Sequence, residues 1–147
     1  METDLVIVMH MVVLEDGRFA THDSECIFIW AQSECVLKWE CHTTELCALG
    51  QDLVASGGPD GTVCVWNTLT GECLWTLVGH TAMVWSLSAM PDHKLASGSA
   101  DRTVRVWDLT SGLCAHVLSH TACVRALVAS EHALVALGID RTVCVWE

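Results

Sequence analysis

Histidine, serine and aspartate recur together in the 147-residue chain, and these are the side chains of a hydrolytic triad. In such a triad the aspartate orients the histidine, which takes the serine proton as the hydroxyl attacks a carbonyl carbon. A hydrolase needs one exposed serine on a sharp turn, and no Gly-x-Ser-x-Gly segment occurs. The trio instead recurs with a tryptophan at a fixed period, whereas an enzyme needs a single active site. The repetition favours a structural role, and we expect no catalytic residues.

The repeat is most visible in three segments of the form Thr-Val-x-Val-Trp. They end at Trp66, Trp107 and Trp146, which are 41 and 39 residues apart. An aspartate lies six residues before each tryptophan, and a histidine lies about twenty residues before each aspartate. This period is that of a repeat built from four short strands. The recurring polar residues are His42 and Asp60, His80 and Asp101, and His120 and Asp140.

The elements that must position these residues are short strands. The Thr-Val-x-Val-Trp segments are rich in β-branched and aromatic residues with a period of two, which is typical of half-buried strands. Before the first of them, the segment 58–61 reads Gly-Pro-Asp-Gly, a sequence suited to a tight turn between strands. Helical periodicity is nowhere sustained. The chain is therefore predicted to be all-β.

The segment from Gly79-His80 through 95–108 (Leu-Ala-Ser-Gly-Ser-Ala-Asp-Arg-Thr-Val-Arg-Val-Trp-Asp) resembles a WD repeat. The resemblance implies four-stranded β-propeller blades. It is strong from residue 42 onward and weaker before, where Trp30 occupies the expected position but Ser24, rather than an aspartate, lies six residues earlier. We expect a single array of about four units at 1–41 (divergent), 42–79, 80–119 and 120–147, the last without its own outer strand.

The order of strands does not decide whether the array closes into a ring. The segment Leu5 to Met9 is expected to form an outer strand. In the family, such an N-terminal strand completes the C-terminal blade and covers its edge. Four units could form a small closed ring, a half-propeller that pairs with a second copy, or a fragment of a larger propeller. Family blades are usually shaped for about seven around an axis, so we favour the second and third arrangements.

By resemblance, a tetrad of histidine, serine, aspartate and tryptophan fastens each blade. Buried polar groups must be paired, and hydrogen bonds to a charged partner contribute about 1.5–3 kcal/mol. Ala136 occupies the serine position of the last unit, which predicts a looser blade. The expected sets are His42, Ser56, Asp60 and Trp66; His80, Ser97, Asp101 and Trp107; and His120, Asp140 and Trp146.

Composition excludes several classes of partner. The net charge of −11 disfavours binding to nucleic acid or to an anionic membrane. No apolar run is long enough to span a bilayer, and the acidic N-terminus does not look like a secretory signal. Nine cysteines without a Cys-x-x-Cys pair suit a reducing compartment, so we expect a cytoplasmic or nuclear protein. Neither a metal site nor a phosphate-binding loop is expected, and no cofactor is implied.

Function is expected where equivalent positions differ between repeats. The position five residues after each tetrad histidine holds Cys47, Trp85 and Arg125. By resemblance it faces the mouth of the central channel, and tryptophan and arginine are enriched at binding hot spots. The alternative is that Trp85 packs between blades and that the Arg125 stem lies along the apolar surface.

Four of the seven basic residues fall between positions 102 and 141, namely Arg102, Arg105, Arg125 and Arg141. A basic patch there would suit an acidic or phosphorylated peptide. The segment 119–125 is similar to repeats of F-box/WD-repeat ubiquitin-ligase receptors, which implies that Arg125 contacts a phosphorylated degron. We therefore predict a protein-interaction scaffold, capable of self-association, and keep a ligase receptor as the alternative.

Overall fold

Residues 8–147, which the computed structural model describes, form fifteen β-strands in four antiparallel sheets and contain no helix. Within each sheet, every strand pairs with the next one along the chain. Sheet 1 contains β1 (His10–Val13), β2 (Phe19–His22), β3 (Cys26–Ala31) and β4 (Glu34–Glu40). Sheet 2 contains β5 (Glu45–Gly50), β6 (Leu53–Gly57), β7 (Val63–Asn67) and β8 (Cys73–Leu77).

The remaining two sheets repeat the same order with one strand fewer at the end. Sheet 3 contains β9 (Val84–Met90), β10 (Lys94–Ser99), β11 (Thr103–Asp108) and β12 (Leu113–Ser119). Sheet 4 contains β13 (Val124–Ala129), β14 (Leu134–Gly138) and β15 (Val143–Trp146). Every connection within a sheet is short, so each sheet is a local unit of the chain.

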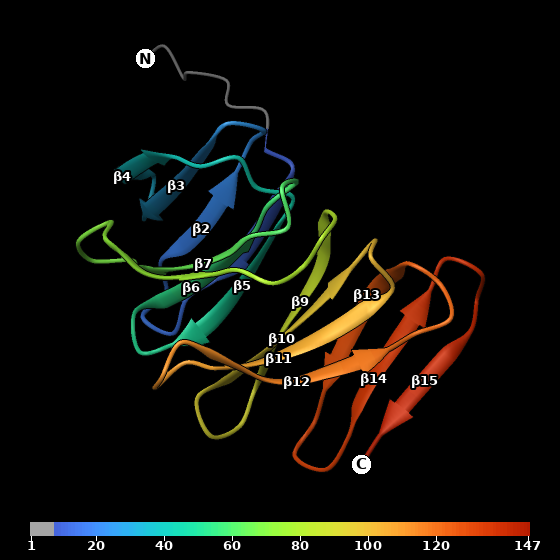
Figure 1. Ribbon diagram of the computed structural model, residues 1–147. Coiled ribbons are helices and arrows are strands. Elements are labelled where there is room, and N and C mark those ends of the chain that lie inside the picture. The colour runs from blue at the N-terminus through green and yellow to red at the C-terminus, as the bar shows by residue number, and fades with distance from the viewer. Residues whose placement is uncertain (1–7) are drawn as a thin grey trace.

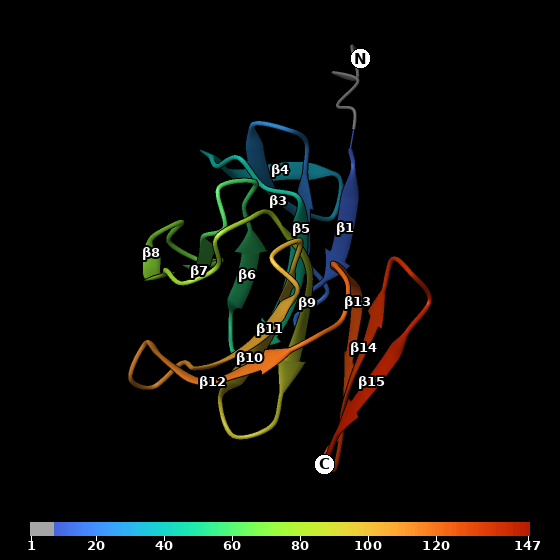
Figure 2. The same cartoon turned by 45° about the vertical axis from the view of Figure 1, so that its right-hand side comes forward.

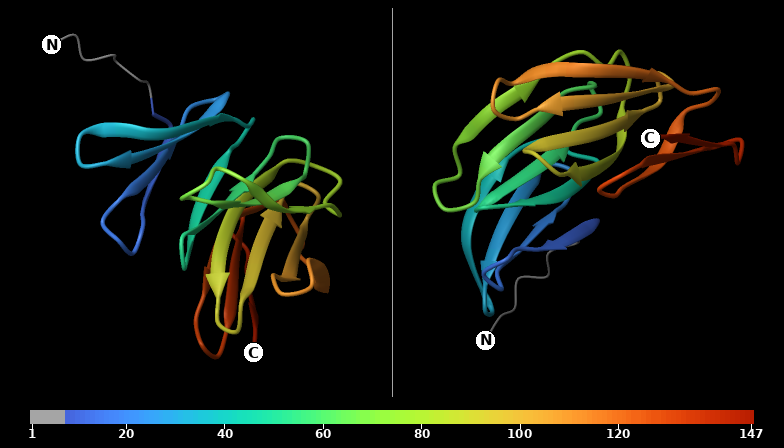
Figure 3. Two further views of the ribbon diagram at one scale, coloured as in Figure 1. Left: turned by 90° about the vertical axis from the view of Figure 1, so that its left-hand side faces the viewer. Right: turned by 90° about the horizontal axis from the view of Figure 1, so that it is seen from below.

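The four sheets follow one another along an arc, with sheet 1 and sheet 4 at its two ends (Figures 1 and 2). The view from below shows the same open arrangement (Figure 3). The first strands of successive sheets contact one another, so β1, β5, β9 and β13 line the inner side of the arc. The array is therefore open and does not close into a small ring.

Each sheet has two different faces because successive side chains of a strand point to opposite sides. One face carries the tryptophan of the repeat, and we call it the aromatic face. The other carries the two valines of the Thr-Val-x-Val-Trp segment or their equivalents, and we call it the valine face. In sheet 3, Leu95 and Trp107 share the aromatic face, whereas Val104 and Val106 share the valine face.

The core consists of three layers, one between each pair of neighbouring sheets. Between sheets 2 and 3, Val63 and Val65 pack in one cluster with Leu95 and Trp107, all at most 1% exposed. Between sheets 3 and 4, Val104 and Val106 pack with Leu127 and Leu134 in the same way. A third cluster joins sheets 1 and 2. In each layer the valine face of one sheet is buried by the aromatic face of the next.

A polar contact reinforces the junction between sheets 1 and 2. Arg18, in the turn after β1, donates hydrogen bonds to the Thr68 carbonyl oxygen at 2.7 Å and to the Asp52 carboxylate at 2.8 Å. Its side chain is only 13% exposed, and Asp16 is a further carboxylate partner. This guanidinium is therefore part of the scaffold.

The expected all-β fold with about four four-stranded units is confirmed, and sheet 4 has three strands among the described residues. The outer strand expected over Leu5 to Met9 falls mainly on residues 1–7, which lie outside the described residues. None of the residues that are described belongs to a helix long and apolar enough to cross a membrane.

Replacement of Val104 by alanine tests the layered core. Val104 is fully buried between sheets 3 and 4, so Val104→Ala is expected to lower the free energy of unfolding by about 2 kcal/mol through lost burial and a cavity. Val117, on the neighbouring strand β12, is 53% exposed, and Val117→Ala is the matched control with little expected effect. Equal losses in urea unfolding would contradict the layered core.

Candidate functional site

One set of polar side chains in sheet 3 forms a continuous chain of hydrogen bonds. The indole Nε1 of Trp107 donates to the Ser97 hydroxyl at 2.8 Å, and this hydroxyl lies 2.7 Å from Nε2 of His80. The His80 Nδ1 lies 2.8 Å from Oδ2 of Asp101. Asp101 also accepts from the backbone nitrogen of Thr81 and from Thr103. The network links the segment before β9 to β10, to β11 and to the turn between them.

The proton positions follow from these partners. Burial lowers the pKa of His80 below its ordinary value of 6.5, against the opposing effect of Asp101. Burial also acts to raise the pKa of Asp101, but hydrogen bonds from Thr103, His80 and Thr81 outweigh it and hold that pKa at about 2. His80 is therefore neutral at pH 7, donates from Nδ1 to the Asp101 carboxylate, and accepts the Ser97 proton at Nε2.

The hydrogen-bonded order of serine, histidine and aspartate in this network is that of a serine-hydrolase triad. The network is buried, however, whereas the serine of a hydrolase must be accessible to substrate. Ser97 has no exposed surface, and its oxygen already accepts the Trp107 proton. The side chain of His80 is fully buried and that of Asp101 is 7% exposed. A carbonyl substrate cannot reach the hydroxyl in this arrangement. What the geometry does provide is a hydrogen-bond partner for each buried polar atom of the set.

In sheet 2 the observed hydrogen bonds differ from the expected tetrad. Trp66 donates to Ser56 at 2.8 Å, but His42 is exposed and its Nδ1 lies 3.2 Å from the Ser24 carbonyl oxygen. Cys41, with its Sγ 3.7 Å from the Ser56 hydroxyl, occupies the place that His80 takes in sheet 3. The structure therefore does not bring His42 together with Ser56.

The backbone supports this assignment of Cys41. The nitrogen of Cys41 donates to the carbonyl of Glu25 at 2.8 Å, just as that of His120 donates to the carbonyl of Arg102. Burial raises the pKa of the Cys41 thiol, so it remains a neutral thiol at pH 7. Asp60 receives its hydrogen bonds from Thr62 in its own turn, and no histidine bonds to it among the described residues.

Sheet 1 contains a hydroxyl partner that the sequence analysis missed. Trp30 donates to the Thr21 hydroxyl at 2.8 Å, and Asp23 accepts from the backbone nitrogens of Glu25 and Cys26. Thr21 thus takes the position of Ser97. It lies nine rather than ten residues before its tryptophan because the turn between β2 and β3 is one residue shorter. The sequence did contain one indication of this role, because Thr21 falls on the same face of its strand as the tryptophan.

In sheet 4 the network is incomplete. Ala136 pairs with Cys144 as Ser97 pairs with Arg105, so no hydroxyl stands at this position. The His120 Nδ1 bonds to the backbone of Ala122, while its Nε2 is buried and has no partner among residues 8–147. Asp140 bonds to Thr142. His120, Asp140 and Trp146 make no hydrogen bonds to one another within the part of the chain that the structure describes.

Two of the expected partner-binding residues lie on β-bulges near the starts of β9 and β13, at the same end of sheets 3 and 4. In sheet 3, Ser86 pairs with Gly98 and Val84 with Ser99, which leaves Trp85 as the extra residue. In sheet 4, the same shift leaves Arg125 as the extra residue. A bulge redirects its side chain out of the regular alternation. Trp85 is half-buried and Arg125 is exposed.

Cys47 does not share this position, contrary to the sequence-based alignment. It pairs with Ala55 inside β5 and corresponds to Val128 of sheet 4, which pairs with Val135. The cause is the shorter segment between Cys41 and β5. Leu46 lies five positions after Cys41, whereas the equivalent Leu127 lies seven positions after His120.

The other three arginines divide into two kinds. Arg102 and Arg141 are exposed at equivalent positions of the β10–β11 and β14–β15 turns, with φ of 67° and 70°. These turns lie at the same end of the sheets as the bulges. Arg105 instead lies against the Trp107 ring and within 3.7 Å of Cys114. The side chains of Arg102, Arg125 and Arg141 are therefore exposed, whereas Arg105 packs within its blade.

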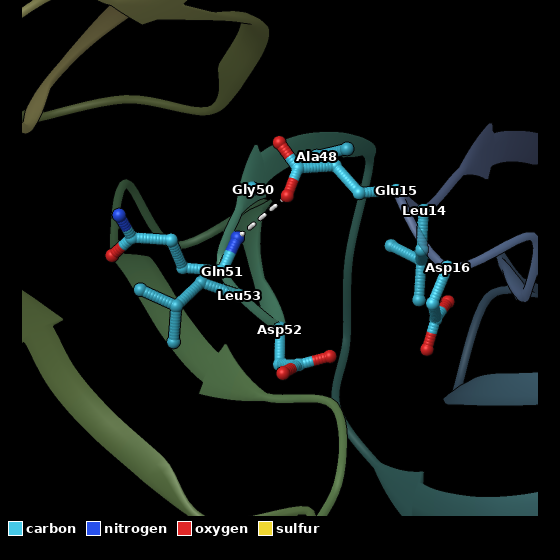
Figure 4. Close-up of a pocket in the computed structure, with 8 residues that line it drawn as sticks. All are labelled: Leu14, Glu15, Asp16, Ala48, Gly50, Gln51, Asp52 and Leu53. Atoms are coloured by element: carbon cyan, nitrogen blue, oxygen red, sulfur yellow. Dashed lines mark hydrogen bonds between the residues drawn. The ribbon is translucent and has the colours of Figure 1, made fainter.

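At the edge of the sheets opposite the bulges, a cavity lies between the β1–β2 and β5–β6 turns (Figure 4). Glu15 crosses it and accepts a hydrogen bond from the backbone nitrogen of Gln51 at 3.2 Å. The lining residues come from the turns that hold sheets 1 and 2 together. Among the residues that the structure describes, no group of three or more histidine, cysteine or acidic side chains could hold a metal ion.

Comparison with known proteins identifies the repeat. A family model described as "WD domain, G-beta repeat" matches residues 33–67 and 71–108. A p21-activated protein kinase-interacting protein 1-like of Danio rerio is 47% identical over 45 residues, which cover 31% of this chain and 12% of that protein. F-box/WD repeat-containing protein 7 of Drosophila melanogaster is 54% identical over 33 residues, 22% of this chain and 2% of that protein. The matches thus span only a small part of these relatives.

Solved structures match almost the whole chain. The WD40 β-propeller domain of Doa1 superposes with a TM-score of 0.87 at 20% identity, covering 95% of this chain and 50% of that one. The computationally designed Ika4 and Ika8 proteins each give a TM-score of 0.85 at 28% identity. Both cover 99% of this chain, which corresponds to 93% of Ika4 but only 47% of Ika8.

Removal of the Ser97 hydroxyl tests the network in sheet 3. Ser97→Ala leaves the Trp107 Nε1 and the His80 Nε2 without a partner, and each such loss costs about 1–3 kcal/mol. Ser56→Ala is the matched control, since that hydroxyl serves the half-buried Trp66 and only a thiol. Urea unfolding is expected to show the larger loss for Ser97→Ala, and equal losses would contradict the network.

Addition of a hydroxyl at the equivalent position of sheet 4 is the reverse test. Ala136→Ser places a hydroxyl where Trp146 and the unpartnered Nε2 of His120 can both use it. We expect a gain of about 1 kcal/mol in the free energy of unfolding. Ala55→Ser, at a fully buried position that lies on the valine face, is the control and should destabilise. A loss of stability in Ala136→Ser would show that sheet 4 has no room for the network.

Acid is expected to destabilise the fold in two stages. The folded-state pKa of His80 is lowered, so below about pH 6.5 the unfolded chain binds a proton that the native chain does not, and stability falls as pH falls. The pKa of Asp101 is about 2, so its contribution is lost between the ordinary value of 3.8 and that value. The melting temperature should therefore decline from pH 7 to about pH 5, and less steeply in His80→Gln. An identical decline in both proteins would contradict the neutral, buried His80.

Proposed function

Because the chain belongs to the WD-repeat family and folds as consecutive β-propeller blades, we propose that it is a non-catalytic scaffold that binds a protein or peptide partner. The observation that supports this proposal is the pair of bulges that present Trp85 and Arg125 at the same end of sheets 3 and 4. A rigid array holds such side chains at fixed spacing, which limits the entropy lost on binding. The closed position of Ser97 and the short connections argue against a catalytic role.

The charge of this region suggests the chemistry of the partner. Residues 84–147 contain five basic and six acidic side chains, whereas residues 1–83 contain two basic and twelve acidic ones. The Arg125 side chain makes no hydrogen bond or ion pair among residues 8–147, and the exposed Arg102 and Arg141 lie in turns at the same end of sheets 3 and 4. Guanidinium groups form paired hydrogen bonds with carboxylate and phosphate. We propose an acidic or phosphorylated peptide as the ligand, with no cofactor.

A ubiquitin-ligase substrate receptor is the second candidate. It is favoured by the 54% identity to F-box/WD repeat-containing protein 7 of Drosophila melanogaster over 33 residues. In this role the acidic or phosphorylated peptide would be a degron that Arg125 contacts. The two candidates share one ligand chemistry and differ in whether the bound peptide receives ubiquitin. The nine free cysteines suit either role inside a cell, in the cytoplasm or nucleus.

Reversal of the Arg125 charge tests the proposed ligand. Binding of a library of phosphorylated and acidic peptides is measured by fluorescence anisotropy at fixed low salt. Arg125→Glu is expected to weaken the hits at least about tenfold, because a charge-assisted hydrogen bond is lost and a repulsive charge is added. Lys94→Glu makes the same charge change at the other end of sheet 3 and should leave binding nearly unchanged. Hits that bind Arg125→Glu as tightly as the wild type would refute this ligand class.

A further inference from the structure

Sheet 4 exposes residues that are buried at every equivalent position of the other sheets. Val143 corresponds to Val63 and Val104, which are fully buried. Val145 corresponds to Val65 and Val106, which are 0% and 5% exposed. In sheet 4 the two valines are 59% and 55% exposed. We call this surface the tail face; it also includes Val128, Val135 and Leu137.

Sheet 1 exposes the complementary kind of surface. Met11 pairs with Thr21 as Leu46 pairs with Ser56 and Leu127 pairs with Ala136. Leu46 and Leu127 are 2% and 9% exposed, whereas Met11 is 57% exposed. We call this surface the head face; it contains Met11 and Val13, which are 57% and 69% exposed, and the partly buried Phe19 and Trp30. Phe19 stacks on Trp30 with ring centroids 6.4 Å apart.

The internal layers show what covers a face of each kind. All three bury the valine face of one sheet under the aromatic face of the next. The surface that fits the tail face is therefore an aromatic face, and among residues 8–147 the aromatic face of sheet 1 is not covered by another sheet. A second copy supplies both surfaces at once. An apolar surface of this kind on the end of a repeat array favours association.

The curvature of the array sets the number of copies. The four sheets superpose closely on about half of the Doa1 propeller-domain chain and of the designed Ika8 chain. The four sheets are therefore rotated relative to one another as in these propellers, where the matched part is about half of the propeller chain. Two copies of the four sheets would then complete one ring. We propose that two copies associate head to tail into an eight-sheet ring, with each tail face buried by the head face of the other copy. Such a contact joins different surfaces and closes when the rotation closes.

Charge favours this arrangement over a head-to-head pair. Residues 10–40, which form sheet 1, contain six acidic side chains and two basic ones. Residues 124–146, which form sheet 4, contain two of each. Two head faces together would place the acidic sheets against each other, whereas head-to-tail contact pairs the acidic sheet with a neutral one.

Mass in solution is the first part of the test. Light scattering after size exclusion of the whole chain is expected to give about twice the chain mass of 16.0 kDa at a concentration of about 100 μM. A monomer of the chain mass would overturn the proposal and leave the two faces to further repeats or to a different protein. A ladder of larger species would overturn ring closure.

Charged variants then test which faces meet. Met11→Lys on the head face and Val145→Glu on the tail face should each give a monomer, because each buries an unpaired charge in both contacts of the ring. An equimolar mixture should return to the double mass, since one contact is native and the other pairs Lys with Glu. Val117→Glu, at an exposed valine of the outer strand β12, should keep the wild-type mass.

Two results would contradict the head-to-tail contact. A dimer in either single variant would show that its face is outside the interface. Monomers that persist in the mixture would show that the head and tail faces do not meet. Circular dichroism and thermal unfolding of each variant distinguish dissociation from loss of the fold, because the mutated residues are exposed in the single chain.

Discussion

The burial of one sheet face by the next is the constraint on which the rest of this structure depends. A four-stranded sheet has two faces, and a lone sheet can hide neither from water. Here each valine face meets the aromatic face of the following sheet, so Val65 and Leu95 come from different repeats yet share one core. Stability then resides mainly in the junctions between neighbours, as in other repeat arrays. The same constraint leaves apolar side chains exposed to water on the outer faces of sheets 1 and 4.

The polar network has a more local task than the apolar layers. Through Ser97, His80 and Asp101, the tryptophan of sheet 3 is tied to the turn and to the segment that enters the sheet. Buried side chains of this kind are costly unless every donor and acceptor is paired, and the four side chains of this network meet that requirement. Sheet 2 replaces the histidine with Cys41, and sheet 4 lacks the hydroxyl. The apolar layers persist in all these sheets, so the network refines a fold that burial already determines.

The sequence predicted those features that depend on residue type and period. The period and the alternation of the Thr-Val-x-Val-Trp segments predicted the strands of the last three units, and the resemblance to a WD repeat implied the divergent first unit and the set around His80. These patterns were not sufficient where a turn or connecting segment differs in length between repeats. The segment between Cys41 and β5 is two residues shorter than its equivalent in sheet 4, so Cys47 does not share the position of Arg125. The turn between β2 and β3 is one residue shorter, so an alignment on Trp30 misses Thr21. The bulges at Trp85 and Arg125 likewise depend on strand pairing, which spacing alone does not reveal.

The proposed function and the proposed ring use different parts of this scaffold. Arg125 projects from the end of its sheet, whereas Val145 lies on a sheet face. Both depend on sheets that hold one another in fixed positions. A double-mutant cycle across the junction of sheets 2 and 3 tests this most directly, with Val65→Ala, Leu95→Ala and the double variant unfolded in urea. Contact across the junction predicts a coupling energy of about 0.5 kcal/mol or more, and strictly additive losses would contradict it.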